Sequence, residues 1–184
     1  VTKIPATGLQ SLFGVGHVRA FGNRTYVVNS DGAKIQILDP CNSFHETQTA
    51  YTLALTADPR DIYVTPSNFG YVTQYGVSTL AKINLTGGGV FYINLGGTLA
   101  DADGNPEMNQ MFVVGNRLYV TLERVNHTTG VPAATSYLAV IDLTTDAVID
   151  MDPIASGNQG IPLVLNRPAS EINLRHHNGA VKAY

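Results

Sequence analysis

The fold is decided by a segment that occurs three times in this chain: Asn23-Arg24-Thr25-Tyr26-Val27-Val28-Asn29, Asn68-Phe69-Gly70-Tyr71-Val72-Thr73-Gln74 and Asn116-Arg117-Leu118-Tyr119-Val120-Thr121-Leu122. The tyrosines of the three copies are 45 and then 48 residues apart. Each copy is rich in β-branched and aromatic residues and begins at an Asn, as a strand after a turn does. The segment therefore indicates a repeat whose unit contains a β-strand.

More strands are expected around each copy. A second strand ends at Asp39, Asn84 and Asp142, which lie 13, 13 and 23 residues after the tyrosines, so the third hairpin contains ten extra residues. A third strand is expected at residues 49–55, 90–95 and 147–151. The strand that opens each unit is expected at residues 15–21, 59–64 and 106–113.

Four short strands in about 45 residues are typical of one β-propeller blade. We therefore predict an all-β fold, a β-propeller of about three complete four-stranded blades and part of a fourth. It forms one partial domain over residues 1–184, with units at 15–58, 59–105 and 106–158 and an incomplete unit at 159–184. An immunoglobulin-like sandwich is the alternative, and it gives no reason for a third copy of the segment.

A propeller usually closes with four to eight blades. We therefore expect this chain to be a segment of a longer protein, or one chain of a ring that partner chains complete. The residues that begin at Asn178 are expected to start the next Asn-x-x-Tyr strand.

Composition excludes several classes of function. Charged residues make up 14% of the chain, the net charge is -3, and Lys and Arg form no cluster, so nucleic acid is not an expected partner. No apolar run approaches the length of a transmembrane segment. The single cysteine excludes an internal disulfide.

The repeat units resemble the YVTN-type repeat of exported bacterial and archaeal propellers. The resemblance lies in Tyr119-Val120-Thr121, in Val140-Ile141-Asp142 and, more loosely, in Tyr26-Val27-Val28-Asn29. The stretch that begins Asp101-Ala102-Asp103-Gly104-Asn105-Pro106-Glu107 is similar to a group of uncharacterised bacterial lipoprotein propellers. The resemblance implies an extracellular or periplasmic location and a binding or scaffolding role, and no catalytic residues come with it.

That same stretch is the sharpest candidate for a metal site. Asp101, Asp103, Asn105 and Glu107 place oxygen-bearing side chains at alternate positions around Gly104. Calcium ions take six to eight oxygen ligands from loops of this kind, so we consider a Ca²⁺ site here. The alternative is an Asx-rich turn whose side chains cap their own backbone.

Two functions are open at this point. The first is a non-catalytic exported propeller that binds a protein, a polymer or a cell surface through the insertion at residues 124–136. Its expected contact residues are Arg124, Asn126, His127 and Thr128. The second is a metal-dependent propeller enzyme of the lactonase or lyase type, with the ion held by the carboxylates around residue 101. No nucleophile motif supports a catalytic residue.

Overall fold

The computed structural model describes residues 16–47, 51–163, 174–177 and 180–183. The regular structure of these residues is β-strand, apart from three single-turn 3₁₀ helices: η1 (Pro40–Asn42), η2 (Leu55–Ala57) and η3 (Gly97–Leu99). Within the described part of the chain, no helix is long and apolar enough to span a membrane.

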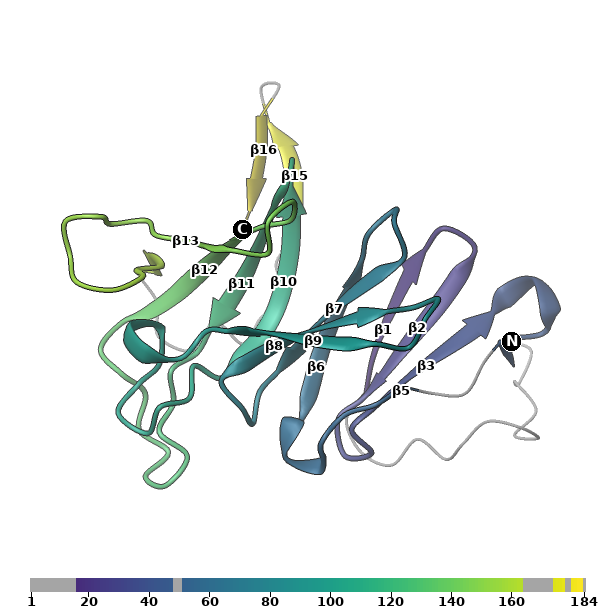
Figure 1. The fold of residues 1–184 in the computed structure, drawn as a ribbon, viewed down its shortest axis with the longest axis horizontal. Helices are drawn as coiled ribbons and strands as arrows, with labels where there is room; N and C mark the ends of the chain where they lie inside the picture. The colour runs from purple at the N-terminus through teal and green to yellow at the C-terminus, as the bar shows by residue number, and fades with distance from the viewer. Residues whose placement is uncertain (1–15, 48–50, 164–173, 178–179, 184) are drawn as a thin grey trace.

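Strands β1 to β14 form three antiparallel sheets that follow one another along the chain (Figure 1). The first sheet contains β1 (Gly16–Phe21), β2 (Arg24–Asn29), β3 (Lys34–Asp39), β4 (His45–Glu46) and β5 (Tyr51–Thr52). The second contains β6 (Pro59–Val64), β7 (Phe69–Gln74), β8 (Thr79–Asn84) and β9 (Val90–Asn94). The third contains β10 (Met108–Val114), β11 (Arg117–Leu122), β12 (Ser136–Asp142), β13 (Val148–Ile149) and β14 (Ile161–Leu163).

The four-stranded units expected from the repeat are confirmed, with one correction at their outer edge. In the first sheet the outer position is filled by β4 and β5, which both pair with β3, in place of one strand over residues 49–55. In the third sheet β13 and β14 both pair with β12, in place of one strand over 147–151. An edge strand is paired on one side only, so an interruption costs few hydrogen bonds.

Some residues of the predicted strands are not described by the structure. Val15 and residues 48–50 lie outside the described residues. Near the C-terminus, β15 (Leu174–His177) and β16 (Ala180–Ala183) form an antiparallel hairpin. Asn178 itself lies outside the described residues, and β16 follows it where the start of the next strand is expected.

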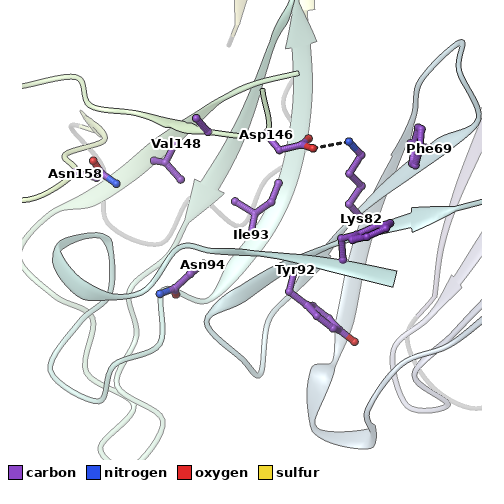
Figure 2. A pocket seen from close by; sticks show the side chains of 10 residues that line it. Phe69, Lys82, Tyr92, Ile93, Asn94, Asp146, Val148 and Asn158 are labelled. Carbon is purple, nitrogen blue, oxygen red and sulfur yellow. Dashed lines mark hydrogen bonds and ion pairs between the residues drawn. The ribbon is translucent and has the colours of Figure 1, made fainter. Parts of the chain in front are cut away.

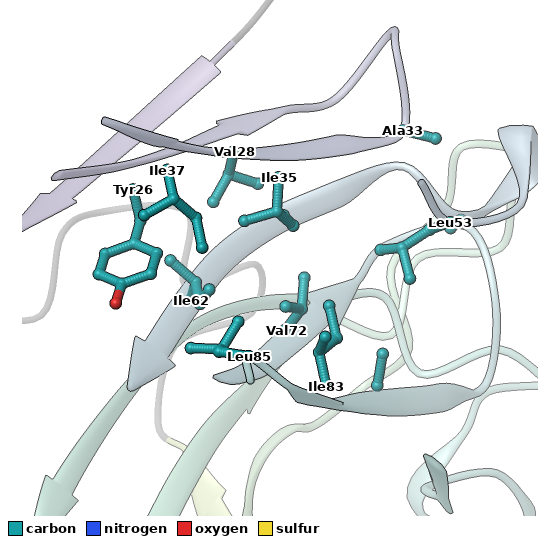
Figure 3. Close-up of a cluster of buried hydrophobic side chains, with 12 residues drawn as sticks. Tyr26, Val28, Ala33, Ile35, Ile37, Leu53, Ile62, Val72, Ile83 and Leu85 are labelled. Carbon is teal, nitrogen blue, oxygen red and sulfur yellow. The ribbon is translucent and has the colours of Figure 1, made fainter. Parts of the chain in front are cut away.

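The sheets pack face to face, and two apolar layers lie between them. In the first layer, Val28, Ile35 and Ile37 of the first sheet point toward Ile62 and Val72 of the second (Figure 3). The second layer lies between the second and third sheets, and its buried members include Tyr71, Leu80, Met108, Leu118, Leu122 and Ile141. The second sheet is thus buried on both faces, because neighbouring residues of a strand point to opposite sides.

The repeated tyrosine occupies the layer that follows its own sheet. Tyr26 belongs to the first layer and Tyr71 to the second, with 6% and 1% of their surfaces exposed. Tyr119, at the same repeat position, is half-buried and stacks on Phe112 with ring centroids 4.9 Å apart. In the first two copies, the repeated tyrosine therefore reflects packing between successive sheets.

A repeated β-bulge shapes the inner strands. Pairing of β6 with β7 shifts register between Pro59 and Ile62, and pairing of β10 with β11 shifts between Met108 and Met111. The N–H at each bulge donates to a threonine hydroxyl of the next strand: Asp61 to Thr73 at 2.8 Å and Gln110 to Thr121 at 2.9 Å. The first sheet has Val28 at this position, and β1 pairs with β2 without a shift.

The bulge in β6 directs a buried carboxylate toward both neighbouring sheets. Asp61 accepts hydrogen bonds from Arg19 Nε of β1 at 2.7 Å and from the Met111 N–H of β10 at 3.0 Å. The Thr73 hydroxyl also crosses to the third sheet and donates to the Asn109 carbonyl at 2.6 Å. These bonds fix the inner strands of three successive sheets relative to one another.

Replacing Thr73 by Val tests the role of the bulge hydroxyl. Thr73→Val keeps the shape but leaves the buried Asp61 N–H and the Asn109 carbonyl without this partner, so the free energy of unfolding falls by about 2–4 kcal/mol. Urea denaturation measures this loss. The exposed Thr52 of β5 is the matched control, and Thr52→Val changes stability by less than about 0.5 kcal/mol. Equal stabilities of the two variants would contradict the assignment.

Candidate functional site

Two loops that lie apart in the sequence leave the third sheet side by side. Met108, which begins β10, pairs with Leu122, which ends β11. The residues before β10 and the residues after β11 therefore emerge at the same end of the sheet. We call residues 101–107 the acidic loop and residues 124–136 the insertion loop, and we call this end of the sheets the site end.

The buried side chain of Glu107 forms the floor between the two loops. None of its side chain is exposed, and its backbone has a φ of 48°. Oε2 accepts a hydrogen bond from the Val125 N–H of the insertion loop at 2.7 Å. Oε1 is also buried and has no hydrogen-bond partner among the described residues. A buried carboxylate oxygen without a partner is costly, so this position calls for a proton or a cation.

Burial raises the pKa of Glu107 to about 8, and the negative charges of Asp101, Asp103 and Glu123 act in the same direction. The hydrogen bond from Val125 opposes this shift. At pH 7, Glu107 therefore carries a proton in most molecules when no cation is bound.

The acidic loop is an Asx-rich turn, as the second interpretation of the sequence expected. Asp101 Oδ1 accepts from the Asp103 N–H at 2.9 Å, and Asp103 Oδ1 accepts from the Asn105 N–H at 3.0 Å. Asn105 donates its side-chain amide to the Tyr75 carbonyl of the second sheet at 3.0 Å, and its own side-chain oxygen is buried with no hydrogen-bond partner in the described part of the chain. Each capping oxygen keeps a second lone pair, so the turn leaves both aspartates able to bind an ion.

The two aspartates differ in their ionisation. Burial alone would raise the pKa of Asp103, but hydrogen bonds from the His127 N–H, from Asp101 and from the Asn105 N–H hold that pKa below its usual value. Burial raises the pKa of Asp101, and its contact with Asp103 adds to the rise. The pKa of Asp103 is therefore lower than that of Asp101.

The insertion loop adds a histidine to the acidic loop. The His127 N–H donates to Asp103 Oδ2 at 2.8 Å, and His127 Nε2 lies 3.8 Å from Glu107 Oε1. Ligand atoms of Asp103, Glu107 and His127 all lie within 4.8 Å of one another. Two residues of the predicted metal site and one residue of the predicted contact loop thus come together.

Arg124 holds the insertion loop in place. Its Nη2 and Nη1 donate to the carbonyls of Ala100 at 2.7 Å and Thr135 at 2.8 Å, and its guanidinium lies 4.7 Å from the centre of the Tyr137 ring. Arg124 is also one of the expected partner contacts, and within the protein its side chain braces the base of the loop. The bond partners are backbone carbonyls, which carry no sequence signal.

The tip of the insertion loop is formed and exposed. A β-bridge joins Val125 to Pro132, and Asn126 Oδ1 accepts from the Thr128 N–H at 3.1 Å. His127 and Thr128 are exposed, and Val131 exposes 61% of its surface. The remaining predicted contact residues therefore lie on or under a structured tip.

Glu123 is a site residue that sequence reasoning missed. It is almost fully buried, and its carboxylate accepts from the Tyr75 hydroxyl at 3.1 Å and from the Asn109 side-chain amide at 2.5 Å. Asn109 lies in the bulge of β10, so this carboxylate connects the site to the contacts between sheets. The only sequence signal is its place directly after the repeated strand.

A hollow lies away from the predicted site residues, between the outer strands of the second sheet and the β12–β13 turn. Its volume is about 690 Å³. Figure 2 shows the ion pair of Lys82 and Asp146 in it, with an Nζ–Oδ2 distance of 2.6 Å. Lys82 Nζ also lies 4.5 Å from the centre of the Phe69 ring, so its charge is already satisfied by the protein.

Comparison of the sequence with protein-family models gives no match, and comparison with curated proteins gives none. Solved structures do match. Hydrazine synthase of Kuenenia stuttgartiensis is 18% identical with a TM-score of 0.54, over 84% of this chain and 37% of that one. Virginiamycin B lyase of Staphylococcus aureus is 11% identical with a TM-score of 0.54, over 91% of this chain and 54% of that one. A streptogramin B lyase is 11% identical with a TM-score of 0.51, over 88% and 51%.

This chain therefore spans about half, or less, of the length of the structures it matches. At these identities the likeness concerns the fold alone. Together with the three successive antiparallel sheets of four or five strands, it confirms the prediction of an all-β fold that forms part of a β-propeller.

Replacing Glu107 by Gln tests the state of the buried carboxyl. A folded-state pKa of about 8 lies above the unfolded value, so the contribution of the wild-type group to stability is complete at low pH and is lost as pH rises toward and through 8. In EDTA, Glu107→Gln should match the wild type at pH 5 and exceed it by about 3 kcal/mol at pH 9. Denaturant unfolding at several pH values measures this, with the exposed Asp31→Asn as control. Parallel pH curves for Glu107→Gln and the wild type would contradict the assignment.

Proposed function

We propose that this chain is part of an exported β-propeller, extracellular or periplasmic and of the YVTN-repeat type, that binds a protein or a surface polymer through the insertion loop. The observation that supports this best is the structured, exposed tip of that loop. A long loop that is already ordered loses less conformational entropy when it binds a partner.

Three sets of contacts preform the loop. Arg124 braces its base against the Ala100 and Thr135 carbonyls. Glu107 and Asp103 accept hydrogen bonds from the N–H groups of Val125 and His127. The side chains that stay exposed are small, polar or aliphatic and carry no net charge of their own, which fits a neutral contact surface better than an ionic one.

The proposed location rests on the repeat resemblance and on the low content of charged residues, 14% of the chain. The rest of the propeller, whether in a longer chain or in partner chains, would complete the ring. The proposed partner contacts lie at the site end, where the loops of neighbouring blades would lie beside one another.

A second candidate is a metal-dependent enzyme of the lactonase or lyase type. The observation that favours it is the meeting of Asp103, Glu107 and His127, whose ligand atoms all lie within 4.8 Å of one another. A metal ion held there could activate a water molecule or polarise a carbonyl group. This candidate requires that the site bind a metal ion, and the experiment described in the next subsection would remove it if no ion binds.

A variant of the tip tests the binding function. Thr128→Ala combined with Val131→Ala removes exposed side chains that make no contact with the site carboxylates, so binding weakens at least about tenfold while the melting temperature is unchanged. The measurement is capture, by the immobilised intact protein, of purified cell-wall polymer and of envelope proteins in separate assays. Ser67→Ala, in the exposed β6–β7 turn at the opposite end of the sheets, is the control. Equal capture by both variants and the wild type would contradict the proposed contact surface.

A further inference from the structure

Asp103, Glu107 and His127 form a small cup between the acidic loop and the insertion loop. Their nearest ligand atoms lie within 4.8 Å of one another. Glu107 is fully buried at the floor, whereas Asp103 and His127 are exposed at the rim. The cup is therefore open to solvent on one side and closed by protein on the other.

The floor of the cup presents an oxygen that the protein leaves unpaired. Glu107 Oε1 is buried and has no hydrogen-bond partner among the described residues, and its distance of 3.8 Å to His127 Nε2 is too long for a hydrogen bond. The other oxygen, Oε2, is held by the Val125 N–H at 2.7 Å, so the carboxylate cannot turn freely to relieve this position. A cation in the cup would supply the missing partner.

We propose that Asp103, Glu107 and His127 bind a divalent transition-metal ion of the zinc class. Zn²⁺ binds both imidazole nitrogens and carboxylate oxygens, and three protein ligands leave a fourth position for water or a bound ligand. Calcium prefers six to eight oxygen ligands, so the histidine favours a transition metal over the calcium ion considered from sequence. The site would join the acidic loop to the insertion loop through the ion.

The geometry requires only a small closure. Metal–ligand bonds of roughly 2.0–2.2 Å in a tetrahedral site place the ligand atoms roughly 3.4 Å apart. Glu107 and His127 are already close to that separation, at 3.8 Å. Asp103 and His127 lie at the exposed rim, where a movement of about 1 Å displaces solvent and no packed side chain.

Contacts around the ligands would hold them in orientation. Asp103 receives hydrogen bonds from the N–H groups of Asn105 and His127, and the His127 ring lies 5.8 Å from the centre of the Tyr75 ring. Such outer contacts orient metal ligands and reduce the freedom that they lose on binding. They are present in the structure before any ion binds.

Titration of the EDTA-stripped intact protein with Zn²⁺ alone tests the proposal. Isothermal titration calorimetry should show that the wild type binds one equivalent of Zn²⁺. Glu107→Gln and His127→Ala should each lower the affinity for Zn²⁺ at least about tenfold. The matched controls are His45→Ala and Asp31→Asn, which change exposed side chains outside the cup and should keep the full affinity. A parallel titration with Ca²⁺ should give weaker binding than Zn²⁺.

Three results would overturn the proposal: absence of Zn²⁺ binding, Zn²⁺ binding that all cup variants retain, or Ca²⁺ binding tighter than Zn²⁺ binding. Thermal melts in EDTA show whether each variant is folded. If Glu107→Gln and His127→Ala do not fold, Asp103→Asn takes their place in the test. It changes only an exposed side chain, so it should remain folded and lose affinity for Zn²⁺. The tip variant Thr128→Ala with Val131→Ala should keep its Zn²⁺, so failure of the metal site and failure of the partner-binding surface are separate results.

Discussion

The buried carboxylate of Asp61 is the contact on which the arrangement of the sheets depends. It accepts hydrogen bonds from Arg19 Nε of the preceding sheet and from the Met111 N–H of the following sheet, so one side chain joins three inner strands. The Thr73 hydroxyl adds a bond to the Asn109 carbonyl. A buried charge is stable only when its partners are in place, so these bonds favour one relative position of the sheets over others.

The candidate site is connected to these same contacts between the inner strands. Asn109 follows the start of β10, and its side-chain amide donates to Glu123, whose own N–H donates to the Glu107 carbonyl. The bulge in β10 therefore sets both the packing between sheets and the position of the acidic loop. Burial of Glu107 among other carboxylates then creates a place where a proton or a metal ion is required, and the insertion loop brings His127 to it.

The sequence predicted the strands well where their pattern is repeated and poorly where tertiary contacts decide. Tyr26, Tyr71 and Tyr119 mark equivalent strands, and the first two pack in the layers between sheets. The outer strands expected at 49–55 and 147–151 are longer than those of the structure, because one-sided pairing tolerates interruptions that composition does not reveal. The meeting of His127 with Glu107 could not be predicted, because it depends on the path of an insertion that no repeat defines. The spacing of its acidic residues identifies the acidic loop, whereas the sequence indicates His127 only as a residue of the expected partner contact.

The central claim is that Asp61 couples successive blades, and a double-mutant cycle tests it most directly. Arg19→Met, Asp61→Asn and the double variant of the intact protein are compared with the wild type by urea denaturation, which gives the interaction free energy of the pair. The account predicts a coupling of about 1–3 kcal/mol, as expected for a hydrogen-bonded ion pair with a buried carboxylate. A coupling below about 0.5 kcal/mol would show that the two blades are held together without this pair, and would contradict the account.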